Sequence, residues 1–194
     1  MFTLFTGLWQ KFTKKAEHTV LILGLDGSGK TSILNQLEQL LFESHSRSAE
    51  KPKPALIIPT IGQNSKLVKT KHADVRLLDL GGGATIRNIW KDYYNEANGI
   101  IFVVDGTNVE RFPEAIAEIT MLMHTISTNN IPFLVFFNKH DQLAFIPSSE
   151  LRNHFEEIRS TAPKIRFQIC SAKTGEGLID GLSWLVFMME ESKT

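Results

Sequence analysis

Lys30 and Thr31 end a glycine-rich stretch whose spacing is typical of loops that bind phosphate groups. Residues 24–31 read GLDGSGKT, which matches the pattern G-x-x-x-x-G-K-[ST]. The glycines allow backbone N–H groups to approach phosphate oxygens, and a helix that begins near Lys30 directs its positive end toward them. The Lys30 ammonium would then reach the β- and γ-phosphates of a nucleotide, and the Thr31 hydroxyl would ligate Mg²⁺. The alternative is a turn without a ligand, which the apolar run before the loop and the helical pattern after it disfavour.

A second candidate site begins at Asp79, which lies at the end of an apolar run and is followed by glycines at 81–83. An acidic residue in this position can hold Mg²⁺ through water, and the glycines allow a backbone N–H to meet a γ-phosphate. The pattern alone is weak, because a turn also explains it. Downstream of a phosphate-binding loop it becomes a strong indication of the same site.

A third candidate site follows the apolar run 131–137 and has the sequence NKHD. The carboxylate of Asp141 can accept hydrogen bonds from both N1–H and the exocyclic amino group of guanine, a pattern that adenine does not offer. Asn138 and Lys139 would brace this loop, whereas His140 is expected to be a solvated loop residue. A last apolar run, 164–170, ends at a short stretch whose backbone would face the guanine O6 atom: Ser171, Ala172 and Lys173.

The elements that must position these residues alternate along the chain. Apolar runs predict strands at 20–23, 66–70, 74–80, 99–105, 131–137 and 164–170. Helical periodicity predicts helices at 30–42, 84–96, 116–126, 148–160 and 178–189. Only the strands predicted at 66–70 and 74–80 are connected by a turn short enough to make them an antiparallel pair. The sequence therefore predicts an α/β fold with a mostly parallel six-stranded sheet, helices on both faces and ligand-binding loops at the carboxyl ends of the strands.

Composition limits the classes of function that remain open. The 194 residues suit one domain, and 21 basic residues balance 21 acidic ones, so no global charge favours nucleic acid. The single cysteine, Cys170, excludes an internal disulfide framework and is expected to be a buried apolar side chain. No apolar run reaches the length of a membrane span. Met121 and Met123 are expected to fill the core.

The first fifteen residues, MFTLFTGLWQKFTKK, precede the first predicted strand. Aromatic and leucine side chains recur at helical spacing and lysines follow, which predicts an amphipathic helix at 1–15 ahead of a single domain at 16–194. Such a helix suits a membrane interface, and permanent packing on the domain is the open alternative. Residue 2 is phenylalanine, which excludes N-myristoylation, so stable attachment would need a second signal or a protein receptor.

The motifs together resemble those of small GTPases of the Arf/Arl family. GLDGSGKT, PTIGQN, LDLGGG, IRNIWKDYY, NKHD and CSAK occur in the order and spacing of that family and cover nearly all of the chain. The resemblance implies a Mg²⁺-dependent switch between GTP and GDP. It implies phosphate binding by Asp26, Gly27, Ser28, Gly29, Lys30, Thr31 and Gly82. It implies guanine binding by Asn138, Lys139, Asp141, Ser171, Ala172 and Lys173, and metal binding by Thr31, Thr60 and, through water, Asp79.

The resemblance also implies a cellular role. In the family the strand pair between the switches slides along the sheet and expels the N-terminal helix, which couples nucleotide state to membrane association. Partners would be effectors, exchange factors and GTPase-activating proteins. Within the family, the start of the chain and PTIGQN are most similar to the Golgi Arf-related protein branch. That branch implies recruitment by an integral membrane protein and a cytoplasmic protein peripheral on Golgi or other endomembranes.

Some positions depart from the family pattern. The glutamine that usually orients the attacking water is replaced by Gly83, so hydrolysis is expected to be slow unless a partner supplies the missing group. A ciliary Arf-like branch also reads DLGGG, and its members can act as exchange factors for another Arf-like GTPase. Gln63 and Leu78 stand where the effector surface usually has Phe and Trp, which leaves effector choice open. The polar loop 43–54 is longer than usual and its role is open as well.

Three hypotheses follow from these observations. The first is a GTP-binding switch in membrane traffic with weak intrinsic hydrolysis. The second is a nucleotide-locked scaffold or exchange factor without useful chemistry, which Gly83 keeps open. The third is a P-loop kinase or ATPase, which NKHD together with SAK disfavours.

Overall fold

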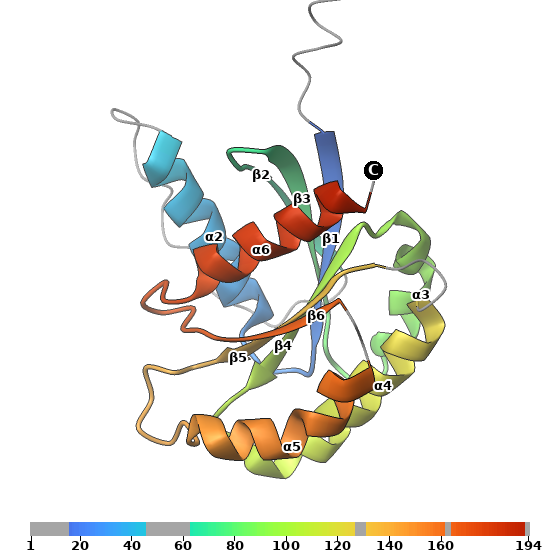
Figure 1. Ribbon diagram of the computed structural model, residues 1–194, viewed down its shortest axis with the longest axis vertical. Coiled ribbons are helices and arrows are strands. Elements are labelled where there is room, and N and C mark those ends of the chain that lie inside the picture. The colour runs from blue at the N-terminus through green and yellow to red at the C-terminus, as the bar shows by residue number, and fades with distance from the viewer. Residues whose placement is uncertain (1–15, 46–62, 127–130, 162–163, 193–194) are drawn as a thin grey trace, which may run out of the picture.

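The computed structural model describes residues 16–45, 63–126, 131–161 and 164–192 (Figure 1). Within these ranges a six-stranded sheet has the order β2-β3-β1-β4-β5-β6. β2 is antiparallel to β3 and the other neighbours are parallel, as the sequence predicts. The strands are β1 (Ala16–Gly24), β2 (Gln63–Lys69), β3 (Ala73–Leu80), β4 (Gly99–Asp105), β5 (Phe133–Asn138) and β6 (Ile165–Ile169).

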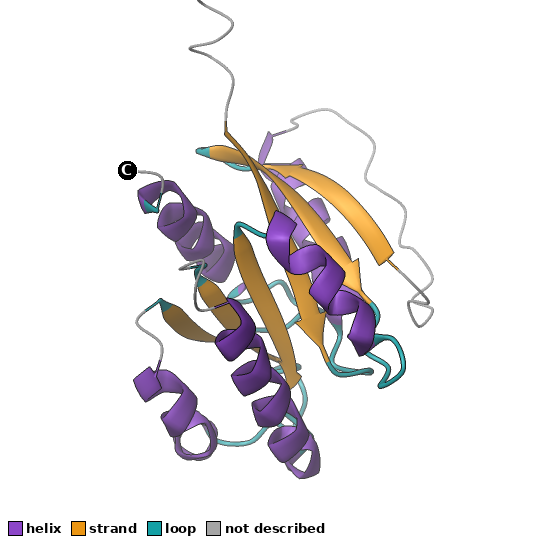
Figure 2. Cartoon of the chain, turned by 90° about the vertical axis from the view of Figure 1, so that its right-hand side faces the viewer, coloured by secondary structure: helices purple, strands orange, loops and turns teal. Residues whose placement is uncertain are grey.

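Helices cover both faces of the sheet (Figure 1 and Figure 2). α2 (Lys30–His45) and α6 (Leu178–Glu191) pack on one face. The other face carries α3 (Trp90–Tyr93), α4 (Phe112–Ile126) and α5 (Ser148–Thr161). The predicted α/β class is therefore confirmed. No helix within the described ranges has both the length and the apolar character needed to cross a membrane.

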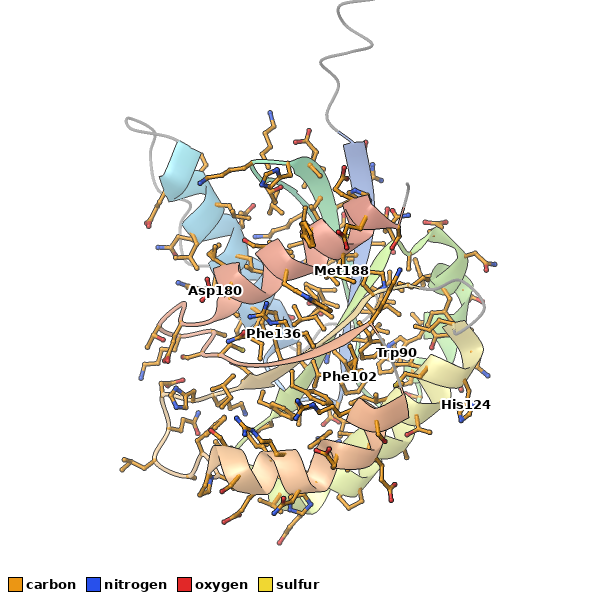
Figure 3. The ribbon with its side chains drawn as sticks, viewed as in Figure 1. Trp90, Phe102, His124, Phe136, Asp180 and Met188 are labelled. Carbon is orange, nitrogen blue, oxygen red and sulfur yellow. The ribbon has the colours of Figure 1, made fainter. Side chains whose placement is uncertain are left out.

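β4 and β5 are apolar up to their last residues because both of their faces are covered. Successive side chains of a strand point to opposite faces, so Phe102 of β4 joins the core beneath α4 and α5, whereas Phe136 of β5 joins the core beneath α2 and α6 (Figure 3). Trp90 packs edge-on against Phe102, with ring centroids 6.3 Å apart. Cys170 is fully buried in the second core, as the sequence predicts.

Two expectations from the sequence are corrected. Residues 84–96 do not form one helix: two 3₁₀ turns, η1 (Arg87–Ile89) and η2 (Tyr94–Glu96), flank the single turn of α3. The segment contains β-branched and asparagine residues, which favour a regular helix weakly, and two of its side chains bond back to the preceding glycine run. Met121 is 48% exposed and does not fill the core, whereas Met123 packs against it.

The carboxyl ends of the parallel strands meet at one edge of the sheet. Ile22 of β1 lies opposite Asp79 of β3, and Asp105 of β4 lies opposite Asn138 of β5. Parallel α/β sheets bind ligands at this edge. The register thus brings the loops after β1, β3, β4, β5 and β6 together, as their motifs require.

Candidate functional site

The loop between β1 and α2 has a backbone that glycine alone adopts readily. Gly24, Gly27 and Gly29 have φ angles of 141°, 73° and 97°, a region that L side chains rarely adopt. A Cβ atom at Gly24 would also lie 2.3 Å from the carbonyl oxygen of Val103 on the neighbouring strand. The Ser28 hydroxyl donates to the carbonyl oxygen of Leu25 at 2.8 Å and closes the turn. These residues form a tight cradle that leads directly into the N-terminus of α2.

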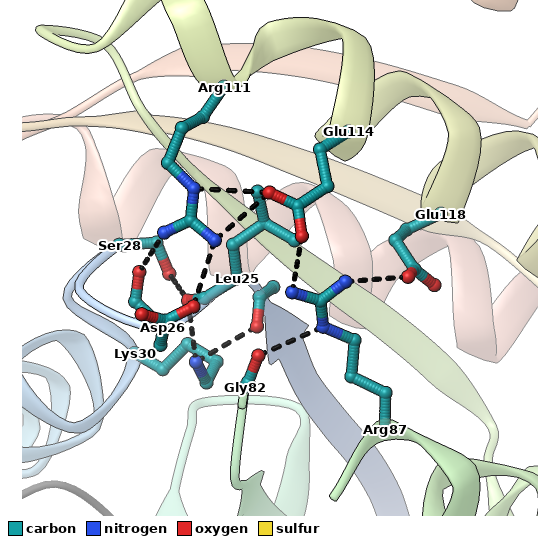
Figure 4. Close-up of polar contacts among 10 residues, drawn as sticks. Leu25, Asp26, Ser28, Lys30, Gly82, Arg87, Arg111, Glu114 and Glu118 are labelled. Atoms are coloured by element: carbon teal, nitrogen blue, oxygen red, sulfur yellow. Dashed lines mark hydrogen bonds and ion pairs between the residues drawn. The ribbon is translucent and has the colours of Figure 1, made fainter. Parts of the chain in front are cut away.

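The Lys30 side chain folds back across this cradle. Its ammonium donates to the carbonyl oxygens of Gly24 and Leu25, each at 2.9 Å (Figure 4). Lys30 is 7% exposed, and burial lowers its pKa to about 8, while the Asp79 carboxylate acts in the opposite direction. Among the described residues no carboxylate lies in hydrogen-bond contact with the Lys30 ammonium, and a buried ammonium in such surroundings favours an anion nearby. The geometry therefore suits contact with a phosphate group.

Thr31 and Asp79 meet between α2 and the end of β3. The Thr31 hydroxyl donates to Asp79 Oδ2 at 2.5 Å, and the Asp79 side chain is fully buried. Hydroxyl and carboxylate oxygens are hard donors, which fit Mg²⁺. The third predicted metal ligand, Thr60, lies outside the described residues.

Two adjacent glycines of the run after β3 have contrasting surroundings. A Cβ atom at Gly82 would lie 2.4 Å from Lys30 Nζ and 2.4 Å from the carbonyl oxygen of Gly24. Gly82 therefore lies directly against the cradle, and a side chain there would obstruct it. At Gly83, in contrast, no heavy atom of the described residues other than Gly83 and its two chain neighbours lies within 4 Å of the Cβ position. The site has room for a side chain at position 83.

Asn138 joins three loops of the site from the end of β5. Its side-chain NH₂ donates to the carbonyl oxygen of Ser28 at 2.9 Å, and its Oδ1 atom accepts from the Ala172 N–H at 2.9 Å. The Cys170 thiol lies 3.9 Å from the same Oδ1 atom. Because Asn138 is 1% exposed, these bonds are shielded from water. The predicted bracing role of Asn138 thus has a geometric basis.

Asp141 lies beside the loop after β6. Its Oδ1 atom accepts from the Ser171 hydroxyl at 2.7 Å, and Lys173 Nζ lies 3.8 Å from its Oδ2 atom. Ser171 Oγ also accepts from the Lys173 N–H at 3.2 Å. The loop after β6 thus holds the Asp141 carboxylate through the Ser171 hydroxyl, with the Lys173 ammonium nearby. The structure therefore brings Asp141, Ser171 and Lys173 together, as the sequence predicts.

Lys139 pairs with a residue that the motif analysis missed. Its ammonium lies 2.6 Å from Asp105 Oδ2, and Asp105 Oδ1 accepts from the Thr107 hydroxyl at 2.6 Å. Burial raises the pKa of Asp105, but hydrogen bonds from Lys139 and Thr107 outweigh this effect and hold the pKa below its ordinary value. Asp105 could have been identified from its position, because it is an acidic residue at the end of an apolar strand, as Asp79 is.

Other missed residues link the cradle to α4. Arg111 donates to the carbonyl oxygen and the carboxylate of Asp26, each at 2.8 Å, and this pairing lowers the pKa of Asp26. Arg87 donates to the carbonyl oxygen of Gly82 at 2.9 Å (Figure 4). A cavity of about 230 Å³ adjoins the cradle between Asp26, Arg111 and Lys139. The carboxylates that pair with these arginines include distant ones, since Asp26 lies 85 residues from Arg111 and Glu118 lies 31 residues from Arg87, so short-range patterns do not reveal those pairs.

Comparisons with known proteins agree with this geometry. The model of the ADP-ribosylation factor family matches residues 4–189. The ADP-ribosylation factor-like protein 3 of Saccharomyces cerevisiae is 31% identical, covering 100% of this chain and 96% of the yeast protein. The ADP-ribosylation factor-related protein 1 of Bos taurus is 32% identical over 96% of this chain and 92% of its own. Among solved structures, the Arl6 (BBS3) small GTPase from Trypanosoma brucei, with bound GppNp, has a TM-score of 0.75 and 27% identity, covering 91% of this chain and 99% of that one.

Proposed function

This chain belongs to the ADP-ribosylation factor (Arf) family of small GTPases, and from that premise we propose that it is a GTP/GDP-binding switch in membrane traffic with weak intrinsic hydrolysis. The observation that carries the proposal is the position of Asn138. One buried side chain joins the phosphate-binding cradle at Ser28 to the guanine-binding loop at Ala172. Such a link holds the two halves of a nucleotide site at a set distance.

We assign the roles of the residues around this link as follows. Asp141 accepts the N1–H and amino group of guanine, while Lys139 lies along the base. Lys30 and the backbone N–H groups of the cradle hold the β- and γ-phosphates. Thr31, Thr60 and Asp79 would hold Mg²⁺, which neutralises phosphate charge when it is bound. The remaining phosphate and base contacts come from Asp26, Gly27, Ser28, Gly29, Gly82, Asn138, Ser171, Ala172 and Lys173.

Weak hydrolysis follows from the residue at position 83. Water attacks the γ-phosphate in line with the leaving oxygen, so a side chain that orients the water accelerates the reaction. Gly83 has no such side chain, although the site has room for one. Lys30 and backbone N–H groups still stabilise the charge of the transition state. The chain therefore binds GTP well and turns it over slowly until a GTPase-activating protein supplies the missing group.

Membrane association would come from residues 1–15, which lie outside the described residues. An amphipathic helix there binds a membrane interface weakly and gains from a receptor. The antiparallel pair of β2 and β3 lies beside β1, and we propose that it couples nucleotide state to exposure of that helix. The protein would then be cytoplasmic and peripheral on Golgi or other endomembranes, with effectors, exchange factors and an integral membrane receptor as partners.

Position 83 also supports a second candidate function. A chain that binds GTP without hydrolysing it serves as a lasting scaffold, or as an exchange factor for another Arf-like GTPase. The open surroundings of Gly83 favour this alternative only if no partner completes the site. Single-turnover hydrolysis, measured with and without a membrane extract as the source of a GTPase-activating protein, distinguishes the two.

Nucleotide competition tests the switch itself. The purified full chain is loaded with fluorescent GDP in Mg²⁺, and unlabelled GDP, GTPγS, xanthosine diphosphate and ATP compete for the site. We expect GDP and GTPγS to displace the label at concentrations at least 100-fold below those of the other two, because Asp141 is complementary to guanine. Equal displacement by ATP would refute the assignment.

Vesicle sedimentation tests the membrane role. The full chain and residues 16–194 are each loaded with GDP or GTPγS and spun with phosphatidylcholine vesicles that contain phosphatidylserine. We expect the GTPγS form of the full chain to sediment and the truncated chain to stay in the supernatant. Undiminished binding of residues 16–194 would show that the first fifteen residues are not the anchor.

A further inference from the structure

Arg87 connects the glycine run after β3 to helix α4. Its Nε atom donates to the carbonyl oxygen of Gly82 at 2.9 Å. Its two terminal nitrogens donate to Glu118 Oε1 at 2.8 Å and to Glu114 Oε1 at 2.6 Å (Figure 4). Its side chain is 10% exposed. A guanidinium that uses all three nitrogens in this way has a defined orientation, because its donors form a rigid plane.

The bond to Gly82 sets the direction of a backbone N–H. In a trans peptide, the carbonyl of one residue and the N–H of the next point to opposite sides. Arg87 therefore directs the Gly83 N–H by holding the Gly82 carbonyl oxygen. Trp90 does the same one peptide earlier, since its indole N–H donates to the carbonyl oxygen of Gly81 at 3.0 Å and so directs the Gly82 N–H.

Gly82, which carries one of these N–H groups and precedes the other, lies at the edge of the phosphate-binding cradle. The Cβ position of Gly82 is 2.4 Å from Lys30 Nζ, so the backbone of Gly82 borders the ammonium that would contact the γ-phosphate. A small rotation of either peptide changes whether its N–H faces that phosphate. The orientation of the glycine run should therefore change the affinity for GTP, which has a γ-phosphate, and leave the affinity for GDP unchanged.

Glu114 extends the connection from Arg87 to the cradle itself. Its second carboxylate oxygen, Oε2, accepts from Arg111 Nε at 3.1 Å and from Arg111 Nη2 at 3.0 Å. Arg111 in turn donates to Asp26 at 2.8 Å. Charges alternate along this chain of residues, which runs Asp26, Arg111, Glu114, Arg87 and Glu118. The phosphate-binding loop and the glycine run after β3, which would both contact a γ-phosphate, are therefore joined through the Glu114 carboxylate on α4.

We propose that Arg87 is a positioning residue of the γ-phosphate site, which orients the Gly82–Gly83 peptide and couples it through Glu114 and Arg111 to the phosphate loop. The inference rests on the proposed function, since it presupposes that GTP occupies the cradle. Backbone N–H groups of the glycine run would recognise the γ-phosphate, which GTP has and GDP lacks. Arg87 then determines how strongly the protein distinguishes GTP from GDP.

The experiment compares dissociation constants for GDP and GTPγS in Mg²⁺ for the full chain and two variants. We expect Arg87→Met to weaken GTPγS binding roughly 5- to 20-fold and to change GDP binding less than roughly twofold, as loss of a hydrogen bond to charged groups would. Arg87→Lys keeps the positive charge on a single donor nitrogen but loses the planar arrangement of three nitrogens, and should recover part of the loss. Arg76→Met is the matched control, because it removes an arginine from the exposed ion pair with Glu17 and should change neither constant.

The outcomes separate the inference from the proposed function. Equal losses for both nucleotides would show that Arg87 supports the site as a whole and not the γ-phosphate position, and no loss for either would show that Arg87 is not needed for binding; each result would overturn the inference. A wild-type chain without preference for guanine would instead overturn the proposed function. If Arg87→Met does not fold, Glu118→Gln is used instead, because it removes one of the carboxylates that hold Arg87. The ratio of the dissociation constants for GTPγS and GDP is then compared with that of the wild type. A selective loss of GTPγS binding supports the inference, and an unchanged ratio contradicts it.

Discussion

The side-chain NH₂ of Asn138 donates to the carbonyl oxygen of Ser28 at 2.9 Å across a separation of 110 residues. We expect Asn138→Ala to lower the free energy of unfolding by about 2–4 kcal/mol, because it leaves the buried Ser28 carbonyl and the half-buried Ala172 N–H without this partner. Urea denaturation measures the difference. Asn98→Ala is the matched control: it removes one exposed hydrogen bond, from the Thr19 N–H at 2.8 Å, and should cost less than about 1 kcal/mol. Similar losses in both variants would contradict the bracing role.

Asp141 should determine which base is bound. Asp141→Asn replaces an acceptor with an amide whose NH₂ donates, which suits the carbonyl of xanthine at the position of the guanine amino group. We expect the preference to shift from GDP toward xanthosine diphosphate by at least roughly 100-fold. Competition against fluorescent GDP and fluorescent xanthosine diphosphate measures this shift. A variant that keeps its selectivity for GDP would place the base elsewhere.

Thr31 should matter more for GTP than for GDP. The Thr31 hydroxyl lies 2.5 Å from Asp79 Oδ2, and these two oxygens would hold Mg²⁺, which would supply positive charge to the phosphates of GTP. We expect Thr31→Asn to weaken GTPγS binding roughly tenfold more than GDP binding. Thr31→Ser retains the hydroxyl and should behave like the wild type. Removal of Mg²⁺ with EDTA should make the wild type resemble the Asn variant, and identical effects on the two nucleotides would argue against a metal role.

Gly83→Gln should accelerate GTP hydrolysis. Apart from Gly83 and its two chain neighbours, no heavy atom of the described residues lies within 4 Å of the Cβ position at Gly83, so the first atom of a side chain meets no steric obstacle there. We expect the single-turnover rate of bound GTP to rise roughly 10- to 100-fold, because the amide orients the attacking water. Gly83→Ala controls for the change in backbone freedom and should leave the rate near that of the wild type. A wild-type rate as fast as that of Gly83→Gln would mean that another group positions the water.

Cys170 should be unreactive in the folded protein. It is fully buried, and burial raises the pKa of its thiol, so little thiolate is present at pH 8. We expect modification by a disulfide reagent to be at least about 100-fold slower in native protein than in urea-unfolded protein, and slower still with GDP present, because a ligand suppresses opening. Rapid labelling of the native protein would show that the loop after β6 opens readily.

Sequence alone predicted those parts of the site whose chemistry is contiguous in the chain. The cradle from Gly24 to Thr31 is one short stretch, and its glycines coincide with positive φ angles. Asp79 and Asn138 could be placed because each ends or follows an apolar strand, and parallel strands end at a common edge. Local periodicity likewise identified the strands and most helices, since burial on one or both faces leaves a direct pattern in the residues.

Tertiary structure decided the contacts whose two partners come from separate elements. Arg111 meets Asp26 across 85 residues, and Arg87 meets Glu114 across 27. A long charged side chain can reach several neighbours, so the sequence does not specify which ion pairs form. The same holds for residues 84–96, where bonds from Arg87 and Trp90 to Gly82 and Gly81 accompany a broken helix that periodicity had predicted as continuous. Short-range patterns determine which elements form, whereas the packing of α4 beside the glycine run determines which of their charges meet.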